Sequence, residues 1–215
     1  MGANHVGEID YLTAIAQPDV ALVNNVGAAH LEGFGSLENI AKAKAEIYNG
    51  LSENGIAVIN QDDAFASYWK DCCSGIKTVS FSMLDESVDV FAKCIDDNHY
   101  QIISKSERAD LRLKVPGKHN VMNALAATAV TLSLELPLQA IVKSLSEFEN
   151  IQGRLTVRYS AAGYQIIADT YNANPLSVTV AIDVLADMQG DTCLLLCDMA
   201  EFDEHADKLP IECGS

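Results

Sequence analysis

The chain carries little positive charge. Its 215 residues include 14 Lys and Arg against 30 Asp and Glu, which gives a formal net charge of -16. Proteins that follow a nucleic-acid backbone need clustered cations, so this composition argues against a long nucleic-acid footprint. An isolated phosphate site remains compatible with it, because such a site needs only a few cations and backbone N–H groups.

The sequence also lacks the signatures of zinc, disulfide-rich and membrane proteins. Its six cysteines include no C-x-x-C pair and no histidine cluster accompanies them, a pattern that fits a reducing compartment. No apolar run reaches the length of about 18 residues that a membrane span requires. The N-terminus "MGANHVGEID" is too polar for a secretory signal. We therefore expect a soluble, cytoplasmic protein.

The common phosphate-binding loops are missing as well. Neither G-x-x-x-x-G-K-S/T nor G-x-G-x-x-G occurs, and the glycines of "GFGS" (33–36) lack the neighbours that such a loop needs. The residues described below suit nucleotide chemistry, but no phosphate cradle accompanies them.

What is present is an alternation of apolar strands and amphipathic helices, which predicts an α/β fold with a parallel, doubly wound sheet. In chain order, the predicted elements are a strand at 19–26, a helix at 36–51, a strand at 56–60, a helix at 63–73 and a strand at 77–82. Three shorter strands follow as a meander within 89–115, and then come two helices, at 121–134 and 138–148.

The alternation restarts after "IQGRL" (151–155), where we place a domain boundary that divides the chain into 1–152 and 153–215. The second unit offers a strand at 164–169, a helix at 178–188 and a strand at 192–198. A doubly wound domain normally has more strands, so we expect the second unit to be truncated.

Lys44 falls in the middle of the apolar face of the helix that starts at the predicted N-cap Ser36. Its stem can be buried while its amine reaches water. Alternatively, desolvation lowers the pKa of the amine, which then acts as a nucleophile or takes up CO2 to form a carbamate, an oxygen ligand for Mg²⁺. His30, just past the carboxyl end of strand 19–26, favours the second interpretation, because ligands bind at that edge. A loop histidine by itself is more often a surface residue.

Asn120 and Asn123 lie three residues apart near the start of a helix and share one face. Asn120 is then either only the N-cap, or the two amides hydrogen-bond the edge of a heterocycle. Arg154 can pair with a phosphate. Asp169, at the end of a strand, can accept a hydrogen bond from a ribose hydroxyl.

Tyr171 and Asn172 belong to the polar loop "TYNANPLS" (170–177) between a strand and a helix. Loops at such turns can contact a ligand, but Asn and Pro are also ordinary turn residues. The sequence leaves both interpretations open.

Several segments together resemble the Mur ligases, and most closely the MurF type. They are "GANHVGEI", "VNNVGAAHLEGFGSLENIAKAKAEIY", "LSENGIAVIN", "VPGKHNVMNALAA", "QGRL" and "DTYNANP". The resemblance runs over nearly the whole chain, with the segments in the family's order. It implies that 1–152 is part of the central ATP-binding domain and that 153–215 begins a Rossmann-like C-terminal domain.

The resemblance implies an ATP-dependent ligase of peptidoglycan synthesis, and hence a role in cell-wall biogenesis, cell shape and cell division. Such an enzyme joins D-alanyl-D-alanine to UDP-N-acetylmuramoyl-tripeptide through an acyl phosphate, with Mg²⁺ neutralising the developing charge. A monomer is expected.

The resemblance also implies roles for individual residues. They are a carbamylated lysine at Lys44, a magnesium ligand at His30, contacts to adenine at Asn120 and Asn123, to the ATP phosphates at Arg154, to the ribose at Asp169, and to substrate at Asn4, His5, Tyr171 and Asn172.

The chain departs from the family pattern in ways that put its activity in doubt. The family's N-terminal domain, its phosphate loop and its acidic metal ligand would precede residue 1, and Cys197 stands where the family usually has Gly. We therefore expect an incomplete, inactive fragment. The alternatives are a non-catalytic nucleotide-binding module and another ligase of the Mur or folylpolyglutamate type.

Overall fold

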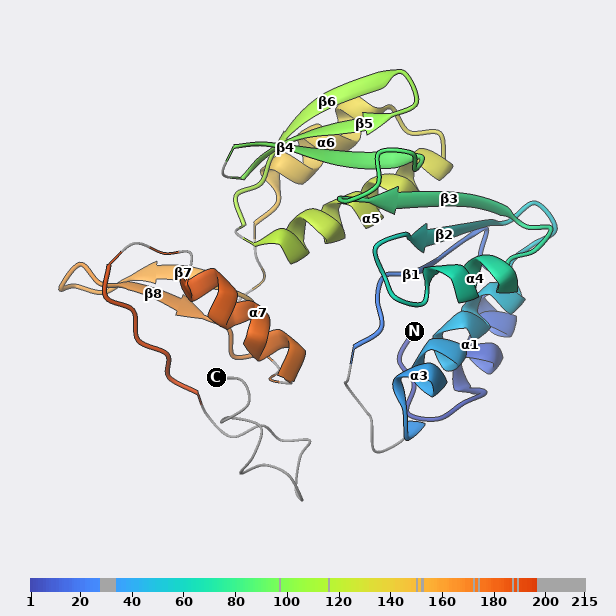
Figure 1. The fold of residues 1–215 in the computed structure, drawn as a ribbon, viewed down its shortest axis with the longest axis horizontal. Coiled ribbons are helices and arrows are strands. Elements are labelled where there is room, and N and C mark those ends of the chain that lie inside the picture. The colour runs from blue at the N-terminus through green and yellow to red at the C-terminus, as the bar shows by residue number, and fades with distance from the viewer. Residues whose placement is uncertain are drawn as a thin grey trace.

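The structure is a computed structural model that describes most of the chain. The described residues are 1–27, 34–96, 98–115, 117–149, 151, 153–171, 173, 175–186, 188 and 190–196. Two of the predicted site residues, His30 and Asn172, lie outside the described residues, and so does Cys197. Figure 1 shows a larger unit built on a six-stranded sheet and a smaller unit with a two-stranded sheet.

The strands of the larger sheet lie side by side in chain order. They are β1 (Val20–Val23), β2 (Ile56–Asn60), β3 (Lys77–Ser82), β4 (Val90–Asp96), β5 (His99–Ser104) and β6 (Glu107–Arg112). β1 to β4 pair in parallel, whereas β4, β5 and β6 pair antiparallel. The predicted parallel sheet followed by a meander is confirmed.

Helices cover both faces of this sheet. On one face lie α5 (Lys118–Ser133) and α6 (Leu138–Glu147), and on the other lie α1 (Glu8–Ala16), α3 (Leu37–Ala45), the 3-10 helix η1 (Glu46–Gly50) and α4 (Ala66–Cys72) (Figure 1). All residues of β2 are buried: Val58 faces the core beneath α5, and Ile59 faces the core beneath α4 and η1. A parallel strand that is covered on both faces usually has a continuous run of apolar residues, and "IAVIN" is mostly apolar. The mixed α/β class is confirmed.

The helix predicted over 36–51 consists of two parts. Ser36 is the N-cap, as predicted, and its Oγ accepts a hydrogen bond from the Asn39 N–H at 3.2 Å. The α-helical part ends at Ala45, and η1 follows. The Thr13 Oγ of α1 donates to the Ile47 carbonyl at 2.9 Å, so a contact from α1 satisfies a carbonyl of this last turn.

Helix α5 begins three residues before the predicted start. Its N-cap is Gly117, with φ +98, so Asn120 lies within the first turn. The interpretation of Asn120 as only the N-cap is therefore wrong.

The smaller unit differs most from the prediction. β7 (Thr156–Tyr159), which was not predicted, pairs antiparallel with β8 (Gln165–Ala168), and α7 (Pro175–Ala186) follows. The strand predicted at 192–198 is wrong for its described part, because 191–196 form no strand and Leu195 is 89% exposed. An apolar run forms a strand only beside a neighbour that offers hydrogen-bonding partners, and the sheet of β7 and β8 does not include this segment.

None of the described helices is both long enough and apolar enough to cross a membrane.

Candidate functional site

A cavity of about 670 Å³ lies between the larger unit and the smaller one. Its walls come from the ends of β1 and β2, from α5, from the end of α6, from Ile151, Arg154 and Leu155, from the residues after β8 and from α7. The volume falls within the range of about 300–1,000 Å³ that is usual for small-molecule sites.

This cavity brings together residues that the sequence placed in separate motifs. Asn120 and Asn123 line it from α5, Arg154 from the segment before β7, and Asp169 and Tyr171 from the segment after β8. Amide, cationic and anionic side chains therefore converge on one space from segments that lie about 15 to 50 residues apart in the chain.

Apolar side chains of the larger unit also line the cavity. They are Leu113, Val115, Met122, Ala124, Ala127, Leu145 and Phe148. Apolar lining combined with a few polar groups is typical of small-molecule binding sites.

Amide side chains form a polar corner where β1 and β2 end. The Asp62 N–H donates to Asn60 Oδ1 at 3.0 Å, and Asn60 Nδ2 donates to the Asn24 carbonyl at 2.8 Å. Asn24 Nδ2 in turn donates to Asn123 Oδ1 at 2.8 Å. The corner thus ties both strand ends to α5. Sequence reasoning missed Asn24 and Asn60, although "VNNV" and "VIN" at strand ends were visible signals.

Arg154 and Asp169 lie on neighbouring segments. The Gly153 carbonyl accepts from the Thr170 N–H at 2.8 Å and from the Tyr171 N–H at 3.0 Å, which holds the two segments together. The Arg154 guanidinium lies 4.2 Å from the centroid of the Tyr171 ring, a cation–π contact. Asp169 Oδ1 accepts from the Leu155 N–H at 3.4 Å.

His119 also lines the cavity, and sequence reasoning missed it. Burial lowers the pKa of its imidazole, and the negative charge of Asp169 acts in the opposite direction. The ring packs closely against Gly117, where an added Cβ would lie 2.5 Å from His119 Cε1. A side chain at position 117 would therefore displace this imidazole.

Lys44 reaches the segment that follows β1. Its Nζ donates to the Asn25 carbonyl at 2.7 Å, and the side chain is half-buried. Burial lowers the pKa of the amine, while the Asp63 carboxylate raises it. Asp63 Oδ2 also accepts from the Val26 N–H at 2.8 Å, so the carboxylate holds the same segment.

The magnesium site predicted at Lys44 and His30 stays a prediction. Within the part of the chain that the structure describes, no group of three or more His, Cys, Asp and Glu residues could hold a metal ion. The half-buried amine at the carboxyl edge of β1 fits a lysine that forms a carbamate.

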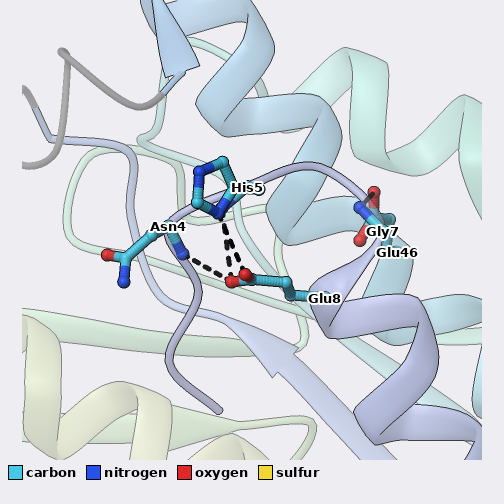
Figure 2. A network of polar contacts seen from close by, with 5 residues as sticks. All are labelled: Asn4, His5, Gly7, Glu8 and Glu46. Carbon is cyan, nitrogen blue, oxygen red and sulfur yellow. Dashed lines mark hydrogen bonds and ion pairs between the residues drawn. The ribbon is translucent and has the colours of Figure 1, made fainter.

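Asn4 and His5 do not line the cavity; they bind Glu8 of α1 (Figure 2). The Asn4 N–H donates to Glu8 Oε2 at 2.7 Å, and His5 Nδ1 lies 3.0 Å from Glu8 Oε1. Glu46 accepts from the Gly7 N–H at 2.7 Å and from the Asp10 N–H at 3.1 Å, and so caps the first turn of α1. The side-chain amide of Asn4 points away from this network (Figure 2).

The chain belongs to the Mur ligase family, because the profile of the Mur ligase middle domain matches residues 1–131. The chain is also similar to particular relatives over its whole length. It is 39% identical to the UDP-N-acetylmuramoyl-tripeptide--D-alanyl-D-alanine ligase of Escherichia coli (strain K12), over 100% of this chain and 48% of that protein. The ligase of the same name from Bacillus subtilis is 33% identical, over 100% of this chain and 47% of that protein.

Solved structures agree with this assignment. MurF from Acinetobacter baumannii superposes with a TM-score of 0.91 at 36% identity, over 100% of this chain and 47% of that one. MurF from Thermotoga maritima in complex with ADP has a TM-score of 0.82 at 28% identity, over 100% of this chain and 50% of that one. The chain spans about half the length of the curated relatives it matches.

Proposed function

We propose that this chain forms the adenosine-binding part of an ATP-dependent ligase that joins D-alanyl-D-alanine to UDP-N-acetylmuramoyl-tripeptide. The observation that carries the proposal is the cavity, which amides, an arginine, a carboxylate and apolar side chains line together. The names of the relatives support the choice of substrates.

The shape and chemistry of the cavity suggest how the nucleotide lies. The base packs against the apolar side chains of the cavity, with Asn120 and Asn123 at its polar edge, since side-chain amides hydrogen-bond the edge of a heterocycle. Asp169 accepts from a ribose hydroxyl. Arg154, whose guanidinium is oriented by the Tyr171 ring, pairs with the phosphates.

The proposed reaction has two steps. The carboxylate of the tripeptide attacks the γ-phosphorus of ATP, which forms an acyl phosphate and releases ADP. The amine of D-alanyl-D-alanine then attacks the acyl carbon, forms the amide and releases phosphate. Lys44, as its carbamate, and His30 would hold Mg²⁺, which supplies positive charge against the phosphoryl oxygens when bound.

This chain contributes adenosine contacts but no sequence of the phosphate-loop type. We propose that, alone, it binds ADP and ATP with similar affinity and does not turn over. The missing phosphate-loop sequence also favours a second candidate function, a non-catalytic nucleotide-binding module.

We further propose that the chain is a cytoplasmic monomer of 23.1 kDa, and light scattering after size exclusion would measure this mass.

Two measurements test the proposed function. Calorimetric titration with ADP and with ATP is expected to give similar dissociation constants, and Asp169→Asn is expected to weaken both. Phosphate release with ATP, Mg²⁺ and both substrates is expected to stay at background for this chain. Absence of any binding to either nucleotide refutes the site, and a strong preference for ATP refutes the adenosine-only mode.

A further inference from the structure

We propose that Asn24 is a positioning residue, which orients the Asn123 amide so that Asn123 presents its NH2 group, and not its carbonyl, to the ligand. The proposal rests on the proposed function, in which the cavity binds adenosine. It adds that the base atom next to Asn123 is a hydrogen-bond acceptor, such as a ring nitrogen of the purine.

Two backbone groups fix the orientation of the Asn60 side-chain amide, because one of them can only donate a hydrogen bond and the other can only accept one. The Asp62 N–H can only donate, and it binds Asn60 Oδ1 at 3.0 Å. The Asn24 carbonyl can only accept, and it binds Asn60 Nδ2 at 2.8 Å. Asn60 is 4% exposed, so its amide is held on both sides in a buried position. The backbone at Asn24 is thereby fixed at the end of β1.

The Asn24 side chain connects the end of β1 to Asn123 on α5. Its Nδ2 donates to Asn123 Oδ1 at 2.8 Å and takes one of the two acceptor positions of that carbonyl. Asn123 Nδ2 forms no hydrogen bond with another described residue, and Asn123 lines the cavity. The NH2 is thus the half of the Asn123 amide that no described residue binds, and the ligand takes that position.

The reverse orientation of the Asn24 amide is less favourable. In the structure, Asn24 Oδ1 is buried and has no hydrogen-bond partner among the described residues. Turning the amide over would leave the NH2 group in that position. An unpaired buried N–H is rarer in proteins than an under-satisfied carbonyl oxygen, so the observed orientation is the preferred one.

The unpaired oxygen also indicates that Asn24 does not serve stability alone. An unsatisfied buried acceptor costs free energy, and an apolar residue at this position would avoid that cost. Replacement by Ala removes one hydrogen bond and one unsatisfied group together. Asn24→Ala is therefore expected to fold normally, which makes its effect on binding interpretable.

A double-mutant cycle tests the proposal. Calorimetry with ADP on Asn24→Ala is expected to give about fivefold to tenfold weaker binding than the unmodified chain. In the Asn123→Ala background, the same change is expected to have no further effect, because Asn24 acts through Asn123. Asn49→Ala is the control, since Asn49 Nδ2 makes a comparable bond, to Asp10 Oδ1 at 2.7 Å, outside the cavity. An equal loss in both backgrounds, or no loss in either, overturns the proposal.

Asn24→Asp tests the orientation directly. The carboxylate keeps the size of the side chain but can only accept, so Asn123 must turn its NH2 group toward it and its carbonyl toward the ligand. Adenosine, which is neutral, serves as the probe because a new charge does not repel it. Binding weaker than that of Asn24→Ala is expected, and binding equal to that of the unmodified chain overturns the proposal.

A measurement without ligand separates this proposal from the proposed function. If the unmodified chain binds neither ADP nor adenosine, the proposed function fails. The ¹H–¹⁵N resonances of the Asn123 side-chain amide still report on the contact. Asn24→Ala is expected to shift them and Asn49→Ala to leave them in place. No shift with Asn24→Ala overturns the positioning role.

Discussion

The amine of Lys44 lies 2.7 Å from the carbonyl oxygen of Asn25, so a lysine on the inner side of α3 binds the backbone that follows β1. Asn25 also lines the cavity. The position that the family resemblance assigns to a carbamylated lysine is thus joined, through one residue, to the proposed adenosine site. A change at Lys44 is expected to affect chemistry more than folding.

The stability of the Lys44→Met variant should depend on pH in a defined direction. Burial holds the pKa of Lys44 below its ordinary value of 10.5, so the unfolded chain binds the proton more tightly than the folded chain. Stability contributed at this site therefore rises with pH and is fully recovered only above 10.5. Lys44→Met should equal or exceed the unmodified chain at pH 7 in urea unfolding, within about 1 kcal/mol. Any excess in the free energy of unfolding of Lys44→Met over the unmodified chain should shrink near pH 10.5. An excess that grows with pH would contradict this.

In a complete ligase that carries this segment, Lys44→Ala should abolish turnover with little loss of folding. Removing groups that stabilise transition-state charge typically costs about 10²-fold or more in rate. Acetate or formate, as a small carboxylate in the space left by the side chain, should restore part of the activity. Phosphate release, with and without acetate, measures both effects, and Lys42→Ala on the exposed side of α3 is the control. Full activity of Lys44→Ala would refute the carbamate.

The charge of Asp169 should influence the titration of His119. Burial lowers the pKa of His119 below 6.5, so the unfolded chain takes up this proton first and stability is lost as the pH falls below 6.5. Asp169 opposes the shift. Asp169→Asn should therefore lower the pKa of His119 further, as an NMR titration of the imidazole Cε1–H would show. A raised pKa in that variant would mean that the carboxylate does not act on the ring.

Arg154 should matter for phosphates and not for the nucleoside. Arg154→Ala should weaken ADP binding by about tenfold or more, because a charge-assisted contact is worth roughly 1.5–3 kcal/mol. Adenosine binding should change little. Calorimetry with the two ligands separates these effects, and Arg158→Ala on β7, outside the cavity, is the matched control. Equal losses for ADP and adenosine would place Arg154 against the base instead.

Gly50 should not tolerate a side chain. An added Cβ there would lie 2.5 Å from the Thr13 carbonyl oxygen and 2.7 Å from its carbon, and this backbone belongs to α1. Gly50→Ala should lower the free energy of unfolding by about 1–3 kcal/mol, as overpacking does. Gly2→Ala, where the added Cβ meets nothing within 4 Å, is the control. Urea unfolding measures both; unchanged stability of Gly50→Ala would show that α1 shifts freely.

Much of the larger unit could be predicted from the sequence by itself. The strands at 56–60 and 77–82 were predicted with the bounds that the structure has, and Ser36 was identified as an N-cap. These features depend on local properties: the period of the apolar residues, turn residues and the hydrogen bond from a side chain to the next turn. The family also followed from the order of short motifs.

In the smaller unit, local sequence patterns did not correctly predict every segment that forms a strand. "TCLLLCD" has the composition of a buried strand, yet its described residues form none, while the polar segment 156–159 forms β7. Strand formation needs a partner at hydrogen-bonding distance, and the partner is chosen by the tertiary fold.

The sequence by itself determined which side chains suit a nucleotide, since donors, acceptors and charges are properties of the residues. Only the tertiary structure decided which of them meet: it brought Asn123, Arg154 and Asp169 to one cavity and left Asn4 and His5 with Glu8. It also revealed Asn24 and His119, whose roles depend on neighbours far away in the chain. The physical reason is that hydrogen bonds and desolvation act over a few ångströms in space, whatever the separation in sequence.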